Sequence, residues 1–249
     1  MPRSQLPPPL PPETRTVGQL VAESLRVYGA HFWPSLSLGI GPALIGVAAA
    51  ELDDPARASV VLGAGPLALS GSYAGAVALL RPIGRGRHIA IALAAGFIAF
   101  VPICASRLWV LPGIYLVSLA WLALVGLSVP AALVERRGFI DAIRRGVQLA
   151  RADFVHALGS LATLVITIFL TGLVLFFSLR ELSDQALRVA GLLALLVLAP
   201  VFVLGAAVLY VDQAARVESG PRTRRNGDGN LHSSFKSDGA GRTDTEVEP

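Results

Sequence analysis

The sequence predicts an all-α membrane protein, a polytopic bundle of about six transmembrane helices with two interfacial amphipathic helices on its cytoplasmic side. Of its 249 residues, 53% are hydrophobic and only 15% are charged, whereas a soluble globular protein carries about 25% charged residues. Several apolar stretches reach the roughly 20 residues that a helix needs to cross a bilayer. Because hydrocarbon offers no water to backbone polar groups, stretches of this length are expected to be helical.

The chain opens with a proline-rich segment, residues 1–15, which we expect to be disordered. Its prolines favour extended chain and leave no apolar core for a cleavable signal peptide, so the first span is expected to act as the insertion signal. The next stretch, VGQLVAESLRVYGAHF at 17–32, collects its apolar residues on one half of a helical wheel. Thr16 and Gln19 have the spacing of a capping box. The pattern predicts an amphipathic helix over 17–31.

Six apolar stretches follow as candidate spans. We expect them at 32–50, 59–80, 89–106, 112–134, 155–179 and 189–211. Only SRLWVLP separates the third span from the fourth, but Arg107 and Pro112 within it favour a break over one overlong helix. Prolines inside the spans predict kinks, because each removes a backbone donor; these are Pro42, Pro66, Pro102 and Pro200.

A second amphipathic segment, FIDAIRRGVQLARADF at 139–154, precedes the fifth span. Its apolar residues fill one half of a helical wheel and its arginines the other, a pattern typical of a helix in the membrane interface. We expect this helix over 139–153. It aligns without gaps with 17–32, and each of the two segments ends in a polar residue followed by Phe. The chain therefore either repeats one unit, an interfacial helix leading into a span, or contains two amphipathic helices that are similar by chance.

Three arginines of this second segment are candidate contacts for anionic lipid: Arg144, Arg145 and Arg151. In an interfacial helix they would face headgroup phosphates, and each would contribute about 1 kcal/mol near an anionic surface. The competing interpretation is a helix tucked beneath the bundle, whose arginines serve only to fix the topology.

The tail and the distribution of basic residues predict the orientation. Residues 212–249 are rich in Gly, Ser and Asp, and their lack of apolar periodicity predicts a disordered cytoplasmic tail. With the N-terminus inside, the segments outside the spans hold 17 basic residues on the inner side and four on the outer side. This asymmetry predicts a multi-pass protein of the cell (plasma) membrane with both termini in the cytoplasm.

Residue types needed for catalysis or metal binding do not form a recognisable site in the sequence. The histidines are His31, His88, His156 and His232, and none has the HxxxH or HExxH spacing of a zinc site. No nucleophile elbow and no phosphate-binding loop occurs. We therefore expect no enzyme activity and no catalytic, metal or cofactor-binding residues. Catalysis within the bilayer is the alternative. Cys104 is expected to be a small apolar side chain within a span.

The polar residues inside the spans are hydroxyls, whereas a coupled transporter usually buries an ionisable group near the midplane. The second and fourth spans carry Ser70, Ser72, Tyr73, Tyr115 and Ser118. In the fifth span Thr163, Thr167 and Thr171 repeat every fourth residue on one face. Such a stripe most often packs against a neighbouring helix, and a polar path for a substrate is the alternative. The GxxxG pair Gly71 and Gly75 is a further candidate for close helix packing.

The stretch PAALVERRGFIDAIRRGVQLARADFVHALGSL resembles a pattern in a bacterial family of six-span membrane proteins related to the membrane domain of glycerophosphoryl diester phosphodiesterases. VAESLRVYGAHFWPSL and AAVLYVDQAAR are similar to that family's first helix and last span. The resemblance covers residues 15–216 and implies a six-span architecture in a bacterial membrane, with almost no indication of mechanism. Gly146 and Val155 stand where the family usually has a serine and an aromatic residue.

These observations favour a non-enzymatic bacterial integral membrane protein that organises lipids or partner proteins at the inner membrane surface. An alternative is a facilitator or transport-complex subunit for a small or lipid-like molecule, which a continuous polar cavity among the second, fourth and fifth spans would favour. A third hypothesis, an intramembrane lipid-modifying enzyme, needs convergent histidine or acidic groups. The expected partners are membrane lipids, anionic ones included, and a protein partner or a second copy of the chain. No nucleic acid and no cofactor is expected.

Overall fold

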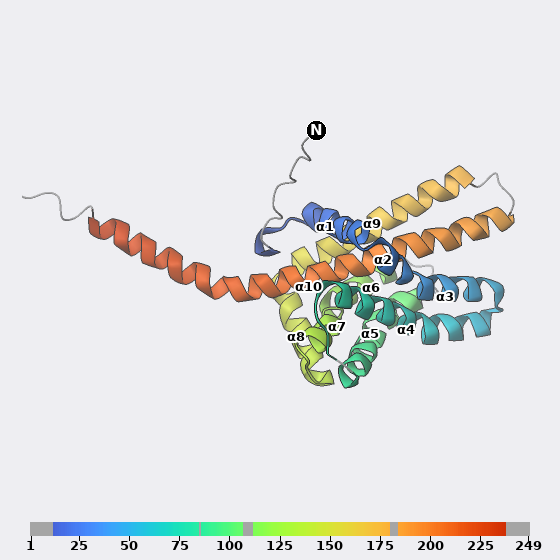
Figure 1. Cartoon of the computed structure of the whole chain (residues 1–249), viewed down its shortest axis with the longest axis horizontal. Coiled ribbons are helices and arrows are strands. Elements are labelled where there is room, and N and C mark those ends of the chain that lie inside the picture. The colour runs from blue at the N-terminus through green and yellow to red at the C-terminus, as the bar shows by residue number, and fades with distance from the viewer. Residues whose placement is uncertain (1–11, 85, 107–111, 180–183, 238–249) are drawn as a thin grey trace, which may run out of the picture.

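A computed structural model describes residues 12–84, 86–106, 112–179 and 184–237, and every regular element within them is a helix. In chain order the elements are η1 (Pro12–Thr14), α1 (Val17–Ala30), α2 (Phe32–Ser37), α3 (Ile40–Glu51), α4 (Asp54–Leu80), α5 (Arg87–Ala105), α6 (Pro112–Val125), α7 (Ser128–Val134), α8 (Phe139–Ala152), α9 (Phe154–Leu179) and α10 (Asp184–Ser237). The all-α fold class is thereby confirmed (Figure 1).

Within the described residues, six stretches are long and apolar enough to cross a membrane: Phe32–Glu51, Asp54–Leu80, Arg87–Ala105, Gly113–Val134, Phe154–Leu179 and Arg188–Glu218. The protein is therefore a multi-pass membrane helix bundle. The first span consists of α2 and α3, and the fourth consists of α6 and α7. The third and fourth spans are separate helices, as expected, and the linker 107–111 lies outside the described residues.

Two prolines in the spans free backbone carbonyls that side chains of other helices then satisfy. Pro42 cannot donate to the Leu38 carbonyl one turn earlier, and the Ser72 hydroxyl on α4 lies 2.6 Å from that oxygen. Pro102 likewise leaves the Ile98 carbonyl without its helical donor, and the indole Nε1–H of Trp121 on α6 donates to it at 3.0 Å. Because an unpaired carbonyl in an apolar environment is costly, these side-chain bonds hold α4 on the first span and α6 on α5.

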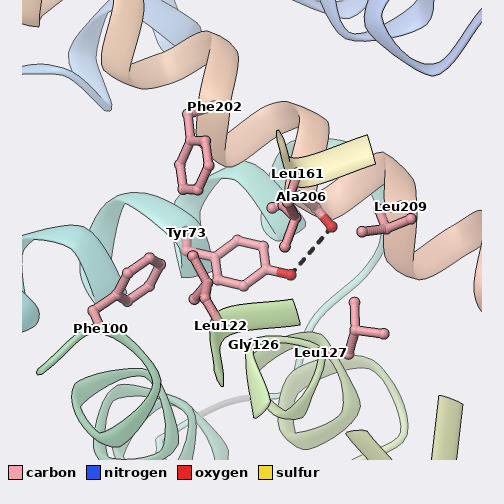
Figure 2. A pocket seen from close by; sticks show the side chains of 9 residues that line it. All are labelled: Tyr73, Phe100, Leu122, Gly126, Leu127, Leu161, Phe202, Ala206 and Leu209. Atoms are coloured by element: carbon pink, nitrogen blue, oxygen red, sulfur yellow. Dashed lines mark hydrogen bonds between the residues drawn. The ribbon is translucent and has the colours of Figure 1, made fainter. Parts of the chain in front are cut away.

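The core is closely packed where α4, α5, α6 and α10 meet. The Tyr73 ring contacts that of Phe100 edge to face, with centroids 6.1 Å apart, and its hydroxyl donates to the Ala206 carbonyl at 3.2 Å (Figure 2). The void beside Tyr73 has a volume of about 10 Å³, roughly enough for one water molecule. This part of the bundle has no room for a larger molecule.

The bundle has two distinct ends. On one side, the Gly84 amide after α4 donates to the Leu133 carbonyl at the end of α7, at 2.9 Å. On the opposite side, Glu51 at the end of α3 pairs with Arg188 near the start of α10, at 2.8 Å. In Figure 1, α1 and α8 lie towards the left, while the α3–α4 turn and the neighbouring ends of α9 and α10 lie on the right. We call the first side the α1/α8 face and the second the opposite face.

Both boundaries of the membrane domain differ from the expected 16 and 211. Arg15 is only 12% exposed and pairs with Asp212 at 2.9 Å, so the ordered chain includes η1 and Arg15. Asp212 and Gln213 are fully buried, and α10 continues as helix to Ser237, where we had expected a disordered tail from residue 212. The helix continues because residues just beyond 211 still pack against the bundle and pair with its charges. Residues 1–11 and 238–249 lie outside the described residues.

Candidate interaction site on the α1/α8 face

Helix α8 packs on the bundle through small residues. Its buried positions are Ala142, Gly146, Leu149 and Ala150. At Gly146 an added Cβ would lie 2.6 Å from the backbone nitrogen of Ser128, so only glycine allows α8 to approach α7 this closely. The serine that the resembled family usually carries here would not fit this packing. Helix α8 is therefore fixed against α7 by backbone-to-backbone contact.

The rest of α8 presents two flanks that do not face the bundle. One is apolar: Ile140 is 63% exposed, and Ile143 and Val147 are partly exposed. The other carries the exposed side chains of Arg144 and Arg151. At about 100° per residue the two flanks adjoin, because Ile140 and Arg151 lie roughly 20° apart on the wheel. The helix thus combines features of both interpretations, since it packs against the bundle and also exposes adjoining apolar and basic strips.

Arg145, the third candidate lipid contact, is bonded within the protein. Its Nε donates to Glu135 Oε1 at 3.0 Å. The same carboxylate accepts a bond from Arg137 at 2.6 Å and one from the Tyr210 hydroxyl of α10 at 2.9 Å. Partial burial by itself would raise the pKa of Glu135, but the bonds from Arg137, Arg145 and Tyr210 outweigh it and lower that pKa. This Glu135 cluster ties α8 to α10 and leaves Arg144 and Arg151 as the exposed arginines of α8.

A second ionic cluster joins three separated parts of the chain. Arg216 on α10 pairs with Asp153 between α8 and α9 at 2.9 Å, and it also donates to the Arg15 carbonyl at 2.8 Å. Arg15 in turn pairs with the buried carboxylate of Asp212. The Gln213 amide donates to the Asp153 carbonyl at 3.2 Å. The entries to α1 and α9 are thereby held on one stretch of α10.

Sequence reasoning missed this second cluster because it assigned 212–216 to the tail. A signal was present in the sequence. Val211, Ala214 and Val217 continue an apolar stripe beyond the last span, and all three pack on the core. Asp212 and Arg216 stand four residues apart, which places both on one face of a continuing helix.

The residues proposed for close helix packing behave differently from one another. An added Cβ at Gly75 would lie 2.6 Å from Leu38, whereas at Gly71 it would meet nothing within 4 Å. In this chain Gly75 is a packing position and Gly71 is not. The hydroxyls of Thr163, Thr167 and Thr171 each donate to the carbonyl four residues earlier in α9, at 2.8 Å. Thr167 and Thr171 are exposed, so their stripe does not lie in a helix interface within the described chain.

The hydroxyls of the second and fourth spans bond to backbone carbonyls. Ser70 donates to the Pro66 carbonyl and Ser118 to the Pro102 carbonyl, in addition to the bonds of Ser72 and Tyr73 above. Tyr115 is 41% exposed and does not contribute to the small void. These bonds account for the four buried hydroxyls without a substrate path.

Chemistry-bearing side chains are sparse in the described part of the chain. No group of three His, Cys, Asp or Glu side chains there has an arrangement that could hold a metal ion. Cys104 is buried within α5. The polar side chains that do gather lie on the α1/α8 face, so this face is the candidate functional site.

Comparisons with known protein families, with curated proteins and with solved structures find no match to this chain. The resemblance to the six-span bacterial family therefore stays a prediction from its sequence pattern.

Proposed function

We propose that this is a non-enzymatic integral protein of the bacterial cell membrane that organises anionic lipids, and through them partner proteins, on the cytoplasmic surface. The α1/α8 face is assigned to the cytoplasm, with both termini on that side. In this proposal α8 lies in the membrane interface. Arg144 and Arg151 bind lipid phosphates while Ile140 and its neighbours rest at the acyl boundary.

The observation that carries the proposal is the adjoining pair of strips on α8. Ile140 exposes 63% of its surface next to arginines whose side chains are also exposed. An exposed apolar side chain is stabilised by hydrocarbon and an exposed guanidinium by phosphate, and the membrane interface supplies both within a few ångströms. Because α8 is held against α7 and tied to Glu135, these groups are presented by a rigid support.

The arginine distribution supports the orientation. Most basic residues outside the spans fall on the α1/α8 face, 17 against four when the tail and the N-terminal segment are counted with it. Such an excess marks the cytoplasmic side of bacterial membrane proteins. It also places Arg144 and Arg151 at the leaflet surface whose negative potential attracts basic side chains.

Lipid retention by matched double variants tests the proposal. Replacing both Arg144 and Arg151 by Gln removes about 2 kcal/mol of attraction to an anionic surface, which corresponds to about 30-fold weaker binding. The control removes two exposed arginines from the opposite face, Arg57→Gln with Arg188→Gln. Native mass spectrometry of protein in mixed micelles of phosphatidylglycerol and phosphatidylcholine measures the bound lipid.

The expected result is reduced retention of phosphatidylglycerol in the α8 variant alone, with phosphatidylcholine unchanged. Equal loss in both double variants would mean that general charge attraction explains the binding. Unchanged retention in the α8 variant would refute headgroup binding by α8.

A further inference from the structure

We propose that the two turns beside α8 form a separate binding site for the phosphate of an anionic phospholipid headgroup. The turns follow α4 and α7, and the groups that bind are Arg81, Arg87 and Arg136. We call this the turn site. It rests on the proposed function only in placing the α1/α8 face at the lipid surface, and it uses none of the α8 arginines.

A backbone hydrogen bond brings the two turns together. The Gly84 amide donates to the Leu133 carbonyl at 2.9 Å, and Gly84 is buried. Arg81 and Arg87 are each three residues from Gly84, and Arg136 is three residues from Leu133. Three residues span at most about 11 Å, so all three arginines begin close to this bond. Segments that are 49 positions apart in the sequence thus bring their cations to one place.

The three arginines are available for a ligand. Their side chains are exposed, and none of them makes a side-chain hydrogen bond or ion pair with the described residues. Two carboxylates lie in these segments. Glu135 is already occupied by Arg137, Arg145 and Tyr210, and Asp141 lies in the first turn of α8. The excess positive charge has no partner within the protein.

The backbone at Arg136 adds an independent reason. Arg136 has φ 54°, and it is the only non-glycine residue with positive φ in the described chain. This left-handed conformation costs a residue with a Cβ about 1 kcal/mol or more, which a glycine would avoid. Strain of this kind is typical of functional positions. A guanidinium held here, beside two others, suits a phosphate, because its donors bind pairs of phosphate oxygens.

The experiment separates the turn site from α8 and from folding. The turn variant combines Arg81→Gln with Arg136→Gly and is compared with the Arg144→Gln, Arg151→Gln double variant and with all four changes together. Glycine at 136 relieves the backbone strain, so the single variant Arg136→Gly should unfold about 1–4 °C higher than the wild type. Native mass spectrometry counts the phosphatidylglycerol molecules bound at increasing mole fraction in phosphatidylcholine micelles.

The turn variant should require about 30-fold more phosphatidylglycerol to fill one class of bound lipid, while the class that depends on α8 stays as in the wild type. The four-change variant should lose both classes. If α8 variants bind as the wild type does but the turn variant loses lipid, the turn site stands and the proposed role of α8 fails.

Two results would overturn the turn site. One is unchanged lipid binding in the turn variant together with the higher unfolding temperature of Arg136→Gly, since Arg136 would then be strained without a ligand. The other is displacement of the lipid by millimolar inorganic phosphate with equal affinity, which would identify soluble phosphate as the ligand. Arg136→Lys, which keeps the charge, should retain most of the binding.

Discussion

Replacing Glu135 by Gln should destabilise the protein measurably, because three donors from separate elements converge on one carboxylate. The change removes the charge and keeps the shape. The bond from Arg137, whose side chain is 42% exposed, is worth about 0.5 kcal/mol as an exposed ion pair. Arg145 is 20% exposed, and its pair with the carboxylate contributes about 1 kcal/mol more than a neutral bond would. Tyr210 is 5% exposed, and weakening its bond adds about 0.5 kcal/mol.

The total, about 2 kcal/mol, corresponds to a midpoint temperature about 4–8 °C lower for a chain of this size. Thermal unfolding in mild detergent, followed by far-UV circular dichroism at pH 7, measures it. The matched control is Glu51→Gln, which breaks the Glu51–Arg188 pair on the opposite face. Both partners there are more than half exposed, so the expected loss is at most about 0.5 kcal/mol. A double-mutant cycle with Tyr210→Phe should give less than additive losses.

The pH dependence follows from the lowered pKa of Glu135. A carboxylate with a lower pKa in the folded state stabilises that state above its unfolded pKa of about 4.3. The contribution disappears as the pH falls through the folded pKa. The difference between wild type and Glu135→Gln should therefore be constant above about pH 5.5 and shrink below about pH 4.3. Equal stability at pH 7, or a difference that grows on acidification, would refute the reasoning.

Two further substitutions test the packing of the bundle in the same unfolding assay. Trp121→Phe removes the donor to the Ile98 carbonyl and should cost about 1–3 kcal/mol, whereas Trp33→Phe, at a position 75% exposed, should cost less than about 0.5 kcal/mol; equal losses would show that the carbonyl is satisfied in another way. Gly146→Ala places a methyl group 2.6 Å from the Ser128 nitrogen and should destabilise by about 1–3 kcal/mol, while Gly18→Ala, where a Cβ meets nothing within 4 Å, should stabilise α1 by up to about 1 kcal/mol. A harmless Gly146→Ala would mean that α8 does not approach α7 so closely.

The fold could be predicted from the sequence because its signals are local. A span is recognised by the length of an apolar stretch, and the capping box of Thr16 and Gln19 forms as expected, with both bonds present. The positions of α1 and α8 follow from the same periodicity. Local signals do not report when a polar helix end continues to pack, which is why the boundary at 211 was placed too early.

The site was predicted only in part, because its contacts join residues far apart in the chain. Arg144 and Arg145 are equivalent as sequence, but only Arg145 faces Glu135, ten residues earlier across a turn. Gly71 and Gly75 form one motif, yet only Gly75 meets another helix. The pairing of Arg15 with Asp212 spans 197 positions. Such pairings depend on the orientation of whole helices, which periodicity does not specify.

The placement of α8 is the central claim, and the most direct test of it is the accessibility of spin labels in liposomes of phosphatidylglycerol and phosphatidylcholine. Single nitroxide labels at Ile140 and Arg144 occupy the apolar and basic strips, and a label at the exposed Arg57 on the opposite face is the aqueous reference. If α8 lies in the interface, molecular oxygen dissolved in the lipid will relax the Ile140 label, and a water-soluble nickel complex will relax the Arg144 label. An Ile140 label that is immobilised and unreachable by oxygen, or that is as open to nickel as the label at Arg57, would contradict the account.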